Sequence, residues 1–304
     1  MSPAAPIALW GRKPSAGVRA VAARLMGRST VFTEDGFLRS VRTGAAGDPA
    51  LAHVVDHTGI YYDATAPSDL EHDIESGVAA ADPALLERAR AGIALLRRHR
   101  LSKYNAAPWR EPTDLGIPAT GEAVLVVDQT AGDLSLRYGA ATAATFAAML
   151  AEARRRHPDA TIVVKTHPAV AAGHRRGHFA DLASAPGLVL VREPVNPWAL
   201  LERCRTVYVA TSQLGFEALM AGCTVHCFGL PFYAGWGLTH DRRAAPRRRR
   251  RASLAEIFAC AYLRYSRYRE PYGLEPCAFE DVVAHLVRLR DHALAQPAPT
   301  VLVG

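Results

Sequence analysis

The chain has 304 residues and a mass of 32.8 kDa, and its 49% hydrophobic and 21% charged residues are typical of a folded protein and exclude general disorder. No apolar run approaches the ~20 residues that a membrane-spanning helix needs, and the first ten residues lack the pattern of a secretory signal. The net charge of +7 suits an anionic partner, namely a nucleotide, an anionic sugar, a nucleic acid or an acidic lipid. Five cysteines without a CxxC pair indicate reduced thiols in a cytoplasmic protein.

In the first part of the chain, short β-branched runs alternate with stretches of helical periodicity. Strands are predicted at Ile7–Trp10, Val31–Thr33, Leu51–Asp56 and Ile60–Tyr62, and helices at Ser15–Gly27 and from Pro83 to about Arg100. The proline-rich segment 105–121 has no periodicity and is the best candidate for a linker.

After the linker the alternation resumes, which predicts a second sheet of parallel strands. Strands are predicted at Ala123–Asp128, Thr161–Thr166, Leu188–Val191, Thr206–Val209 and Thr224–Cys227, and helices at Ala140–His157, after Asn196–Pro197 and at Ser212–Met220. We therefore predict an α/β protein with domains at 1–118 and 119–252. The tail, 253–304, is expected to pack its helices Ser253–Arg269 and Phe279–Leu294 back on the body.

Two segments that follow predicted strands carry groups suited to phosphate. In Lys165–Pro168 (KTHP) a lysine and a histidine can donate hydrogen bonds, and the proline fixes the loop. Thr211–Glu217 (TSQLGFE) opens a helix whose free N–H groups favour a phosphate, and Glu217 is placed to accept ribose hydroxyls. Ligands of parallel sheets bind beyond the carboxyl ends of the strands, so both segments belong to one expected site. A strand-end turn and a helix N-cap are the plainer interpretations.

Carboxylates gather in two further loops. Asp128–Asp133 (DQTAGD) follows a strand and can supply a base or a nucleophile, although the spacing does not distinguish Asp128 from Asp133. Glu34–Arg39 (EDGFLR) ends a strand of the first half. If the halves face each other, its acids meet the phosphate site and Arg39 can pair with an anionic sugar. An Asx-type turn and an ordinary loop are the structural alternatives.

Two segments near the end of the second half are ambiguous. Gly229–Leu238 (GLPFYAGWGL) joins aromatic residues to glycines, and it forms either a platform for a base or sugar or a rigid packed turn. Arg247–Arg251 is either a solvated run or a contact for an acidic membrane or a nucleic acid. No recognised nucleic-acid-binding motif accompanies it, and no nucleic acid is expected as partner.

Nine short strings occur in a characteristic order between about residue 8 and about residue 290. They are Trp10–Ser15 (WGRKPS), Glu34–Val41 (EDGFLRSV), Gly59–Thr65 (GIYYDAT), Ser102–Asn105 (SKYN), Val126–Asp133 (VVDQTAGD), Val164–Pro168 (VKTHP), Asn196–Glu202 (NPWALLE), Thr211–Leu219 (TSQLGFEAL) and Phe228–Arg242 (FGLPFYAGWGLTHDR). Together they resemble the KpsC-type capsule polysaccharide β-Kdo transferases. The acid-acid-glycine and HP strings also resemble motifs of bacterial sialyltransferases, which likewise use CMP-activated keto-sugars.

This resemblance implies a GT-B-like glycosyltransferase with two Rossmann-like domains, in which the first binds the acceptor and the second binds CMP-Kdo. It implies transfer of Kdo to a Kdo-terminated glycolipid built on lyso-phosphatidylglycerol, at the cytoplasmic face of the inner membrane. The β configuration would be retained by double displacement through an aspartyl–Kdo adduct. No cofactor is implied, and no divalent metal is expected because no DxD-type motif is evident.

The resemblance also implies roles for individual residues. The donor nucleotide would be held by Lys165, His167, Pro168, Thr211, Ser212, Gln213 and Glu217. The sugar and the acceptor would contact Arg39, Gln129, Tyr233 and Trp236. Asp133 is the expected nucleophile and Asp128 the alternative, while Glu34 or Asp35 would orient or deprotonate the acceptor hydroxyl.

The family usually carries two such modules in one chain, whereas this sequence matches one and resembles the second of them. The sequence does not indicate which linkage is formed. A different class of function is also considered, a non-catalytic component of the capsule assembly complex that binds CMP or glycolipid. The acids retained at the expected cleft argue against it.

Overall fold

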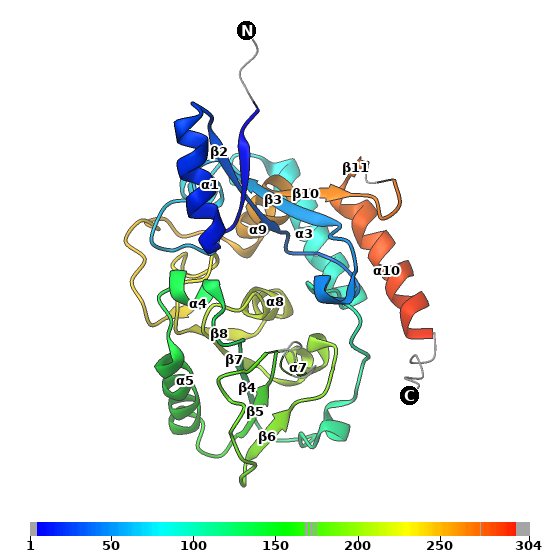
Figure 1. The fold of residues 1–304 in the computed structure, drawn as a ribbon. Coiled ribbons are helices and arrows are strands. Elements are labelled where there is room, and N and C mark those ends of the chain that lie inside the picture. Colours follow the sequence, from blue (N-terminus) through cyan, green and yellow to red (C-terminus); the bar gives the residue numbers. More distant parts are fainter. Residues whose placement is uncertain (1–4, 168–169, 171–172, 174, 274, 296–304) are drawn as a thin grey trace, which may run out of the picture.

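The computed structural model describes residues 5–167, 170, 173, 175–273 and 275–295, and it consists of two lobes, each with its own sheet (Figure 1). The upper lobe contains β1 (Ile7–Trp10), α1 (Pro14–Leu25), β2 (Thr30–Asp35), a 3-10 turn (Gly44–Ala46), β3 (Ala52–Asp56), α2 (Asp69–Ser76) and α3 (Pro83–His99). The tail adds α9 (Leu254–Phe258), a π-helical segment (Ala259–Tyr265), β10 (Ser266–Arg269), β11 (Pro276–Cys277) and α10 (Phe279–Ala295) to the same lobe.

The lower lobe follows a short 3-10 turn (Pro112–Leu115) in the predicted linker. Its strands are β4 (Ala123–Val127), β5 (Thr161–Lys165), β6 (Leu188–Val191), β7 (Thr206–Val209), β8 (Thr224–Cys227) and β9 (His240–Asp241). Its helices are α4 (Leu134–Tyr138), α5 (Ala143–Arg156), α7 (Pro197–Arg203) and α8 (Leu214–Ala221). The strand order is β6-β5-β4-β7-β8-β9 and every pairing is parallel, as predicted for this half.

The upper sheet is mixed, so the prediction of a parallel first half is wrong. Its order is β1-β2-β3-β10-β11, and after the parallel pair β1–β2 each pairing is antiparallel. Between β2 and β3 the chain makes only a loop and a 3-10 turn, without the helical crossover that parallel neighbours need. Residues 60–62, predicted as a strand, form a turn whose tyrosines pack against other aromatic rings.

The helix predicted over Ser253–Arg269 ends earlier, at Tyr265, and its last four residues form β10 instead. Ser266 and Tyr268 are buried while Arg267 and Arg269 are exposed, which is the alternation of a half-buried strand, and β10 pairs with β3. The tail is therefore part of the upper sheet. Helix α10 matches the second predicted tail helix closely.

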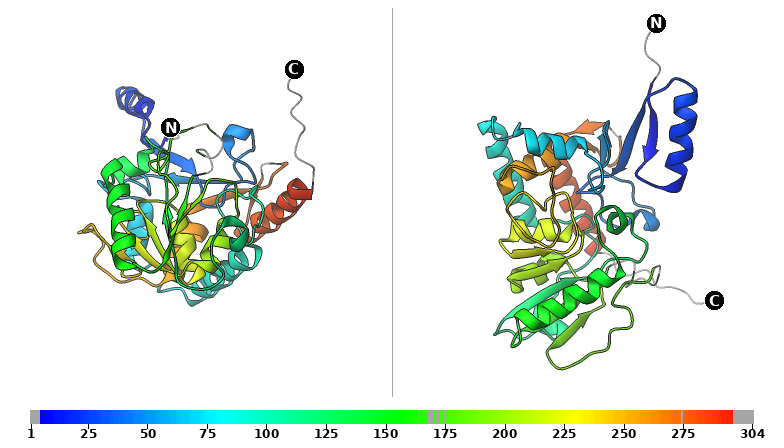
Figure 2. Two further views of the ribbon diagram at one scale, coloured as in Figure 1. Left: turned by 90° about the horizontal axis from the view of Figure 1, so that it is seen from below. Right: turned by 90° about the vertical axis from the view of Figure 1, so that its left-hand side faces the viewer.

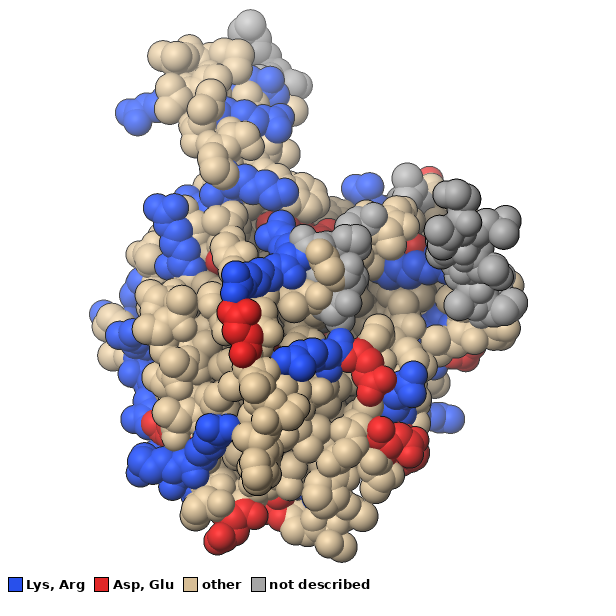
Figure 3. All heavy atoms as spheres, turned by 60° about the horizontal axis from the view of Figure 1, so that its bottom comes forward, with Lys and Arg blue, Asp and Glu red and all other residues tan. Residues whose placement is uncertain are grey.

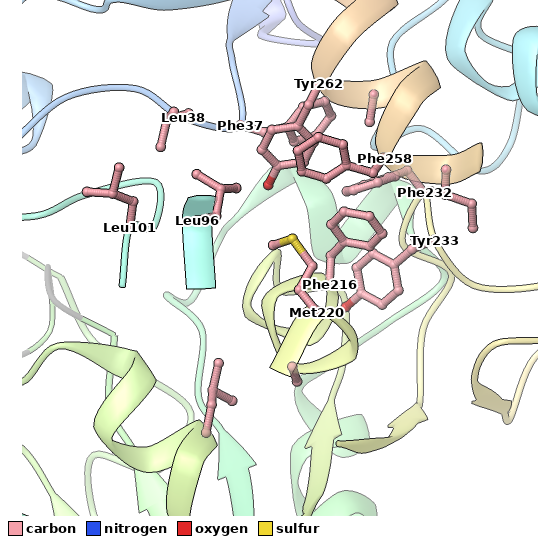
Figure 4. Close-up of a cluster of buried hydrophobic side chains, with 14 of the residues drawn as sticks. Phe37, Leu38, Leu96, Leu101, Phe216, Met220, Phe232, Tyr233, Phe258 and Tyr262 are labelled. Carbon is pink, nitrogen blue, oxygen red and sulfur yellow. The ribbon is translucent and has the colours of Figure 1, made fainter. Parts of the chain in front are cut away.

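One hydrophobic core runs through both lobes. Figure 4 shows its centre, where Phe37 of the upper lobe meets Tyr262 of the tail and Phe216 of α8. The ring centroids of Phe37 and Tyr262 lie 5.3 Å apart, and those of Phe216 and Tyr262 lie 5.9 Å apart. A smaller core fills the other side of the lower sheet beneath α5. The tail thus packs against residues of both lobes.

The arginine run also joins the lobes, so it is not the free basic patch that the sequence suggested. Arg247 and Arg248 both pair with Glu71 of α2, at 2.6 and 3.0 Å, and Arg250 pairs with Glu256. Arg248 is itself buried. Only the side chains of Arg249 and Arg251 remain exposed, which leaves too little of the run for a membrane patch.

All five cysteines are free, and four of them are buried, as expected for reduced thiols. Within the described residues, none of the helices combines the length and the apolar character required to cross a bilayer.

Candidate active site

A cleft of about 990 Å³ lies between the lobes, above the carboxyl ends of β4, β5 and β7. This is the edge at which parallel sheets bind ligands. The upper lobe contributes Lys13, Glu34, Asp35, Tyr61 and Lys103 among others. The lower lobe contributes Asp128, Gln129, Asp133, Lys165, His167, Thr211, Ser212, Gln213 and Glu217 among others. The structure thus brings together the three predicted lower-lobe segments and the acidic loop of the first half.

Asp133 stands at the start of α4 and lines the cleft. One carboxylate oxygen, Oδ1, accepts a hydrogen bond of 2.8 Å from the backbone N–H of Ser135. Gly132 before it also lines the cleft and has a φ of 78°, a left-handed conformation that suits glycine. The side chain is only partly buried, so a ligand in the cleft can reach it.

His167 faces the same part of the cleft. Burial lowers its pKa to about 4, and the negative charge of Asp133 acts in the opposite direction. The imidazole is therefore neutral at pH 7 and can donate only one hydrogen bond. Pro168, predicted to fix this loop, lies outside the described residues.

Lys165 ends β5 and is almost fully buried. Its Nζ donates to the carbonyl oxygen of Thr166 at 3.1 Å, and burial lowers the pKa of the amine to about 8. A buried ammonium with one hydrogen-bond partner among the described residues is well suited to an anionic ligand, because such a ligand replaces the solvation that burial removes.

Asp128 differs from Asp133 in how its oxygens are used. Its buried carboxylate accepts hydrogen bonds from the backbone N–H groups of Gln129 and His178, both at 2.9 Å, and of Phe179 at 3.4 Å. A Cβ added at Gly177 would lie 2.1 Å from Asp128 Oδ2, so loop 177–179 wraps closely around the carboxylate. The carboxylate of Asp128 is therefore held by its own loop.

Gln129 and Thr211 form a closed pair on the floor of the cleft. The amide of Gln129 donates to Thr211 Oγ1 at 3.0 Å, and its oxygen accepts from the backbone N–H of Thr211 at 2.9 Å. Ser135 Oγ lies 3.0 Å from the same hydroxyl. Ser212 Oγ accepts from the N–H of Leu214, with which α8 begins. The N–H of Thr211 is thus already paired, whereas Ser212 stays at the cleft surface.

Gln213 and Glu217 lie where the lobes meet. Gln213 Nε2 donates to the carbonyl oxygen of Phe37 at 2.6 Å, so its amide nitrogen links the lobes. The hydroxyl of Ser102 lies 2.7 Å from both carboxylate oxygens of Glu217. Burial raises the pKa of Glu217 to about 7, and the hydrogen bonds from Ser102 and from the N–H of Lys103 oppose this.

On the opposite wall, Glu34 and Asp35 end β2. Burial raises the pKa of Glu34. Arg39 does not line the cleft: its Nε pairs with Asp35 Oδ2 at 2.8 Å and its Nη1 donates to Ser40 Oγ and to the carbonyl of Asp48. The expectation that Arg39 holds a sugar carboxylate is therefore wrong, since the guanidinium positions Asp35. The other oxygen, Asp35 Oδ1, is buried without a hydrogen-bond partner among the described residues.

Sequence reasoning missed Lys103 and Tyr61, which complete this wall. The pKa of Lys103 is raised, because the nearby Tyr61, Asp35 and Glu34 outweigh the effect of burial. Burial raises the pKa of Tyr61 to about 12, so the phenol keeps its proton and can donate a hydrogen bond. The only signal for these residues was their place in the strings SKYN and GIYYDAT, because neither has a charge pattern of its own.

Tyr233 and Trp236 are buried in the core and do not line the cleft, so the prediction that they form a sugar platform is wrong. Tyr233 donates its hydroxyl to the carbonyl of Ser212 at 2.5 Å, and Trp236 donates to the carbonyl of Phe232 at 2.8 Å. The glycine-rich loop is thus the rigid packed turn. From this loop Phe232, with Pro231, reaches the cleft. In the described part of the chain, no three His, Cys, Asp or Glu side chains are grouped as metal ligands would be.

Two α/β lobes with a cleft at the carboxyl edge of a parallel sheet define a GT-B-like fold, as predicted. The model of a family described as capsule polysaccharide biosynthesis protein matches residues 5–268, and the chain belongs to this family. The resemblance drawn from the sequence strings is confirmed.

Relatives and solved structures agree with this assignment. The chain is 40% identical over 289 residues to the capsule polysaccharide modification protein LipA of Neisseria meningitidis serogroup B, which covers 92% of this chain and 41% of the relative. The chain therefore spans about two fifths of the length of that protein. Among solved structures it is similar to Thermosulfurimonas dismutans KpsC, beta Kdo 2,4 transferase, with 42% identity, a TM-score of 0.87 and coverage of 92% of this chain and 86% of the other. The beta Kdo 2,7 transferase of the same KpsC gives 30% identity, a TM-score of 0.66 and coverage of 93% and 84%.

Proposed function

We propose that this chain is a retaining β-Kdo transferase of capsule synthesis, which transfers Kdo from CMP-Kdo to a Kdo-terminated glycolipid. The similarity to two solved structures named as Kdo transferases supports the reaction class. The higher TM-score and identity with the beta Kdo 2,4 transferase favour a 2,4 linkage. Cofactors and divalent metal ions are not part of this proposal.

The observation that carries the proposal is the position of Asp133. It is the acid of the lower lobe that is both partly exposed in the cleft and close to His167, whereas Asp128 is used by its own loop. Lys165 and Ser212 lie on the same wall and suit the phosphate of a nucleotide. Negative charge that develops on a departing CMP would be stabilised by donors already in place.

In the first displacement, Asp133 attacks the anomeric carbon of Kdo, and the bond to the CMP phosphate breaks with its electron pair leaving on CMP. In the second, an acceptor hydroxyl attacks the same carbon and the aspartyl oxygen leaves. Two inversions return the β configuration. Glu34 is better suited than Asp35 to remove the hydroxyl proton, because burial raises its pKa whereas Asp35 is paired with Arg39.

Asp133→Asn and Asp128→Asn, incubated with CMP-Kdo and a synthetic Kdo-terminated acceptor, provide the test. We expect Asp133→Asn to lose at least about a thousandfold in kcat, as nucleophile replacement generally does, while its thermal unfolding stays unchanged. Without acceptor, mass spectrometry of the native chain should find Kdo bound to the peptide that contains Asp133. NMR of the product identifies the linkage.

Normal transfer by Asp133→Asn would refute the assignment of the nucleophile. Binding of CMP by the native chain, with no transfer to any Kdo acceptor, would refute the enzyme and favour a binding component of the capsule assembly complex. A Kdo adduct on Asp128 would support the same class of reaction but would identify Asp128, and not Asp133, as the nucleophile.

A further inference from the structure

Helix α1 exposes its apolar side to solvent, which is the reverse of what a globular helix normally does. Val18, Val21 and Leu25 are 74%, 62% and 84% exposed. Their spacing of three and four residues places them on one face. The buried residues, Ala16 and Ala23, lie on the opposite face, toward β1. The side of the helix with the larger apolar groups therefore has no partner within the described residues.

Basic residues surround this apolar face. The first 33 residues contain five basic residues and no acidic one, and the first acid of the chain is Glu34. At about 100° per residue, Arg19 and Arg24 fall on the two sides of the apolar stripe, and both are exposed. The part of the surface that projects at the top of Figure 3 accordingly shows Lys and Arg but no Asp or Glu. This side of the molecule is thus both apolar and positively charged.

The helix also has a defined relation to the cleft. Figure 2 shows α1 standing out from the body of the upper lobe beside β1. Its first residue, Pro14, and the preceding Lys13 line the cleft described above. A surface that covers α1 therefore lies next to the cleft entrance.

We propose that the exposed face of α1 docks on an anionic lipid bilayer. A short apolar stripe with arginines on both sides is the pattern of a helix that lies in the plane of the lipid headgroups, where the apolar groups enter the boundary of the acyl chains and the arginines pair with phosphates. A second copy of this chain fits less well, because two faces of the same positive charge repel each other. The exposed stripe of one 12-residue helix is also small against the roughly 800 Å² per partner of a stable interface.

Docking through α1 has a consequence that rests on the proposed function. It places the cleft entrance at the membrane surface, where the sugar end of a lipid-linked acceptor is found. The arginine run 247–251 is not needed for this, since most of it is paired inside the protein.

The charge part of the proposal is tested with the full chain and vesicles of phosphatidylglycerol or phosphatidylcholine. We expect the native chain to sediment with the phosphatidylglycerol vesicles only. Arg19→Gln/Arg24→Gln should bind about thirtyfold more weakly, which corresponds to ~2 kcal/mol for two basic residues near an anionic surface. The matched control Arg249→Gln/Arg251→Gln loses the same charge from the other basic segment and should bind like the native chain.

The apolar part is tested with Val21→Ser/Leu25→Ser, which should bind the same vesicles about tenfold more weakly at high salt, where only the apolar contacts remain. Tyr272→Ser is the matched control, because Tyr272 is 85% exposed but lies far from α1 on the β10–β11 turn. All three residues are at the surface, and thermal unfolding checks that each variant is folded. Kdo transfer to a water-soluble acceptor should stay unchanged in each.

Equal binding of the native chain to both kinds of vesicle would overturn the proposal, and so would equal loss of binding in the α1 variants and their controls. A native chain that dimerises without lipid, and that Val21→Ser/Leu25→Ser makes monomeric, would show that a second copy covers α1 and would overturn it as well. These outcomes do not depend on transfer, so a failure here is distinct from a failure of the proposed function.

Discussion

The buried guanidinium of Arg248 is expected to contribute much of the free energy that holds the lobes together. Its Nε donates to Glu71 Oε2 at 3.0 Å, and its Nη1 donates to the carbonyl oxygens of Pro231 and Ala234, both at 2.6 Å. Burial lowers the pKa of the guanidinium, and the carboxylate of Glu71 opposes this. Arg248→Met fills a similar volume but removes every one of these hydrogen bonds.

The size of the effect follows from what the substitution leaves behind. Removing one partner of a buried ion pair costs about 3–5 kcal/mol, because the other charge is left without compensation. Here Arg247 still pairs with Glu71 at 2.6 Å, which reduces that part of the cost. Two buried carbonyls lose their donor, at about 1 kcal/mol or more each. We therefore expect the free energy of unfolding to fall by about 3–4 kcal/mol.

Urea unfolding, followed by tryptophan fluorescence and by circular dichroism, measures the loss. Trp236 is a suitable reporter because the guanidinium of Arg248 lies 5.6 Å from its ring centroid. Arg251→Met is the control for loss of charge at an exposed position and should change the free energy by less than about 0.5 kcal/mol. Equal unfolding of the two variants would refute the view that this run is an internal connection between the lobes.

Three further predictions concern pH, packing and metal. Burial lowers the pKa of His226 to about 4 from the ordinary 6.5, so the unfolded chain takes up the proton first as pH falls. The free energy of unfolding should therefore drop by about 2 kcal/mol from pH 7 to pH 5. His226→Phe should remove this pH-dependent contribution when urea unfolding is measured at both pH values. Gly177→Ala should lower kcat about tenfold by pushing the loop off Asp128, whereas Gly17→Ala, with open space around its Cα, should not. Transfer should be unaffected by EDTA, and a loss that Mg²⁺ reverses would contradict the metal-free proposal.

The five main strands of the lower lobe could be predicted almost to the residue because they carry their signal locally, whereas the short elements α4 and β9 were not predicted. Ala123–Val127 is buried at every position, so the run of β-branched residues is itself the pattern of a central parallel strand. Such a run has no competing helical period, and the helices between the strands confirm the parallel order. The same reasoning placed three polar segments at one edge, which is why most of the site residues were found together.

The upper lobe was harder because its decisive contacts are distant in sequence. In Ser266–Arg269 a strand follows a helical segment without a glycine or proline to mark the change, and the pairing with β3 crosses about two hundred residues. Nothing in four residues that alternate serine, arginine and tyrosine distinguishes such a strand from one more turn of helix. Tertiary pairing overrides local propensity here.

The choice between Asp128 and Asp133 could not be made from their spacing for a similar reason. Both follow the same strand and both stand in a polar loop around Gly132. Both line the cleft, and what separates them is loop 177–179, whose N–H groups donate hydrogen bonds to the carboxylate of Asp128. The observation behind our proposal of Asp133 as nucleophile is therefore a contact between Asp128 and a segment about fifty residues further along.

The distribution of charge shows the opposite, because the most conspicuous basic segment of the sequence is not the one with the most unpaired charge at the surface. The run Arg247–Arg251 dominates the sequence, but acids of α2 and α9 neutralise most of it inside the protein. The five basic residues before Glu34 are scattered along the sequence. Arg12 pairs with Asp63, whereas Lys13, Arg19 and Arg24 are exposed and have no acidic residue near them in the sequence. Basic residues without acidic neighbours attract an anionic surface more strongly than a run of paired arginines does, because the carboxylate in an ion pair cancels most of the field of its guanidinium.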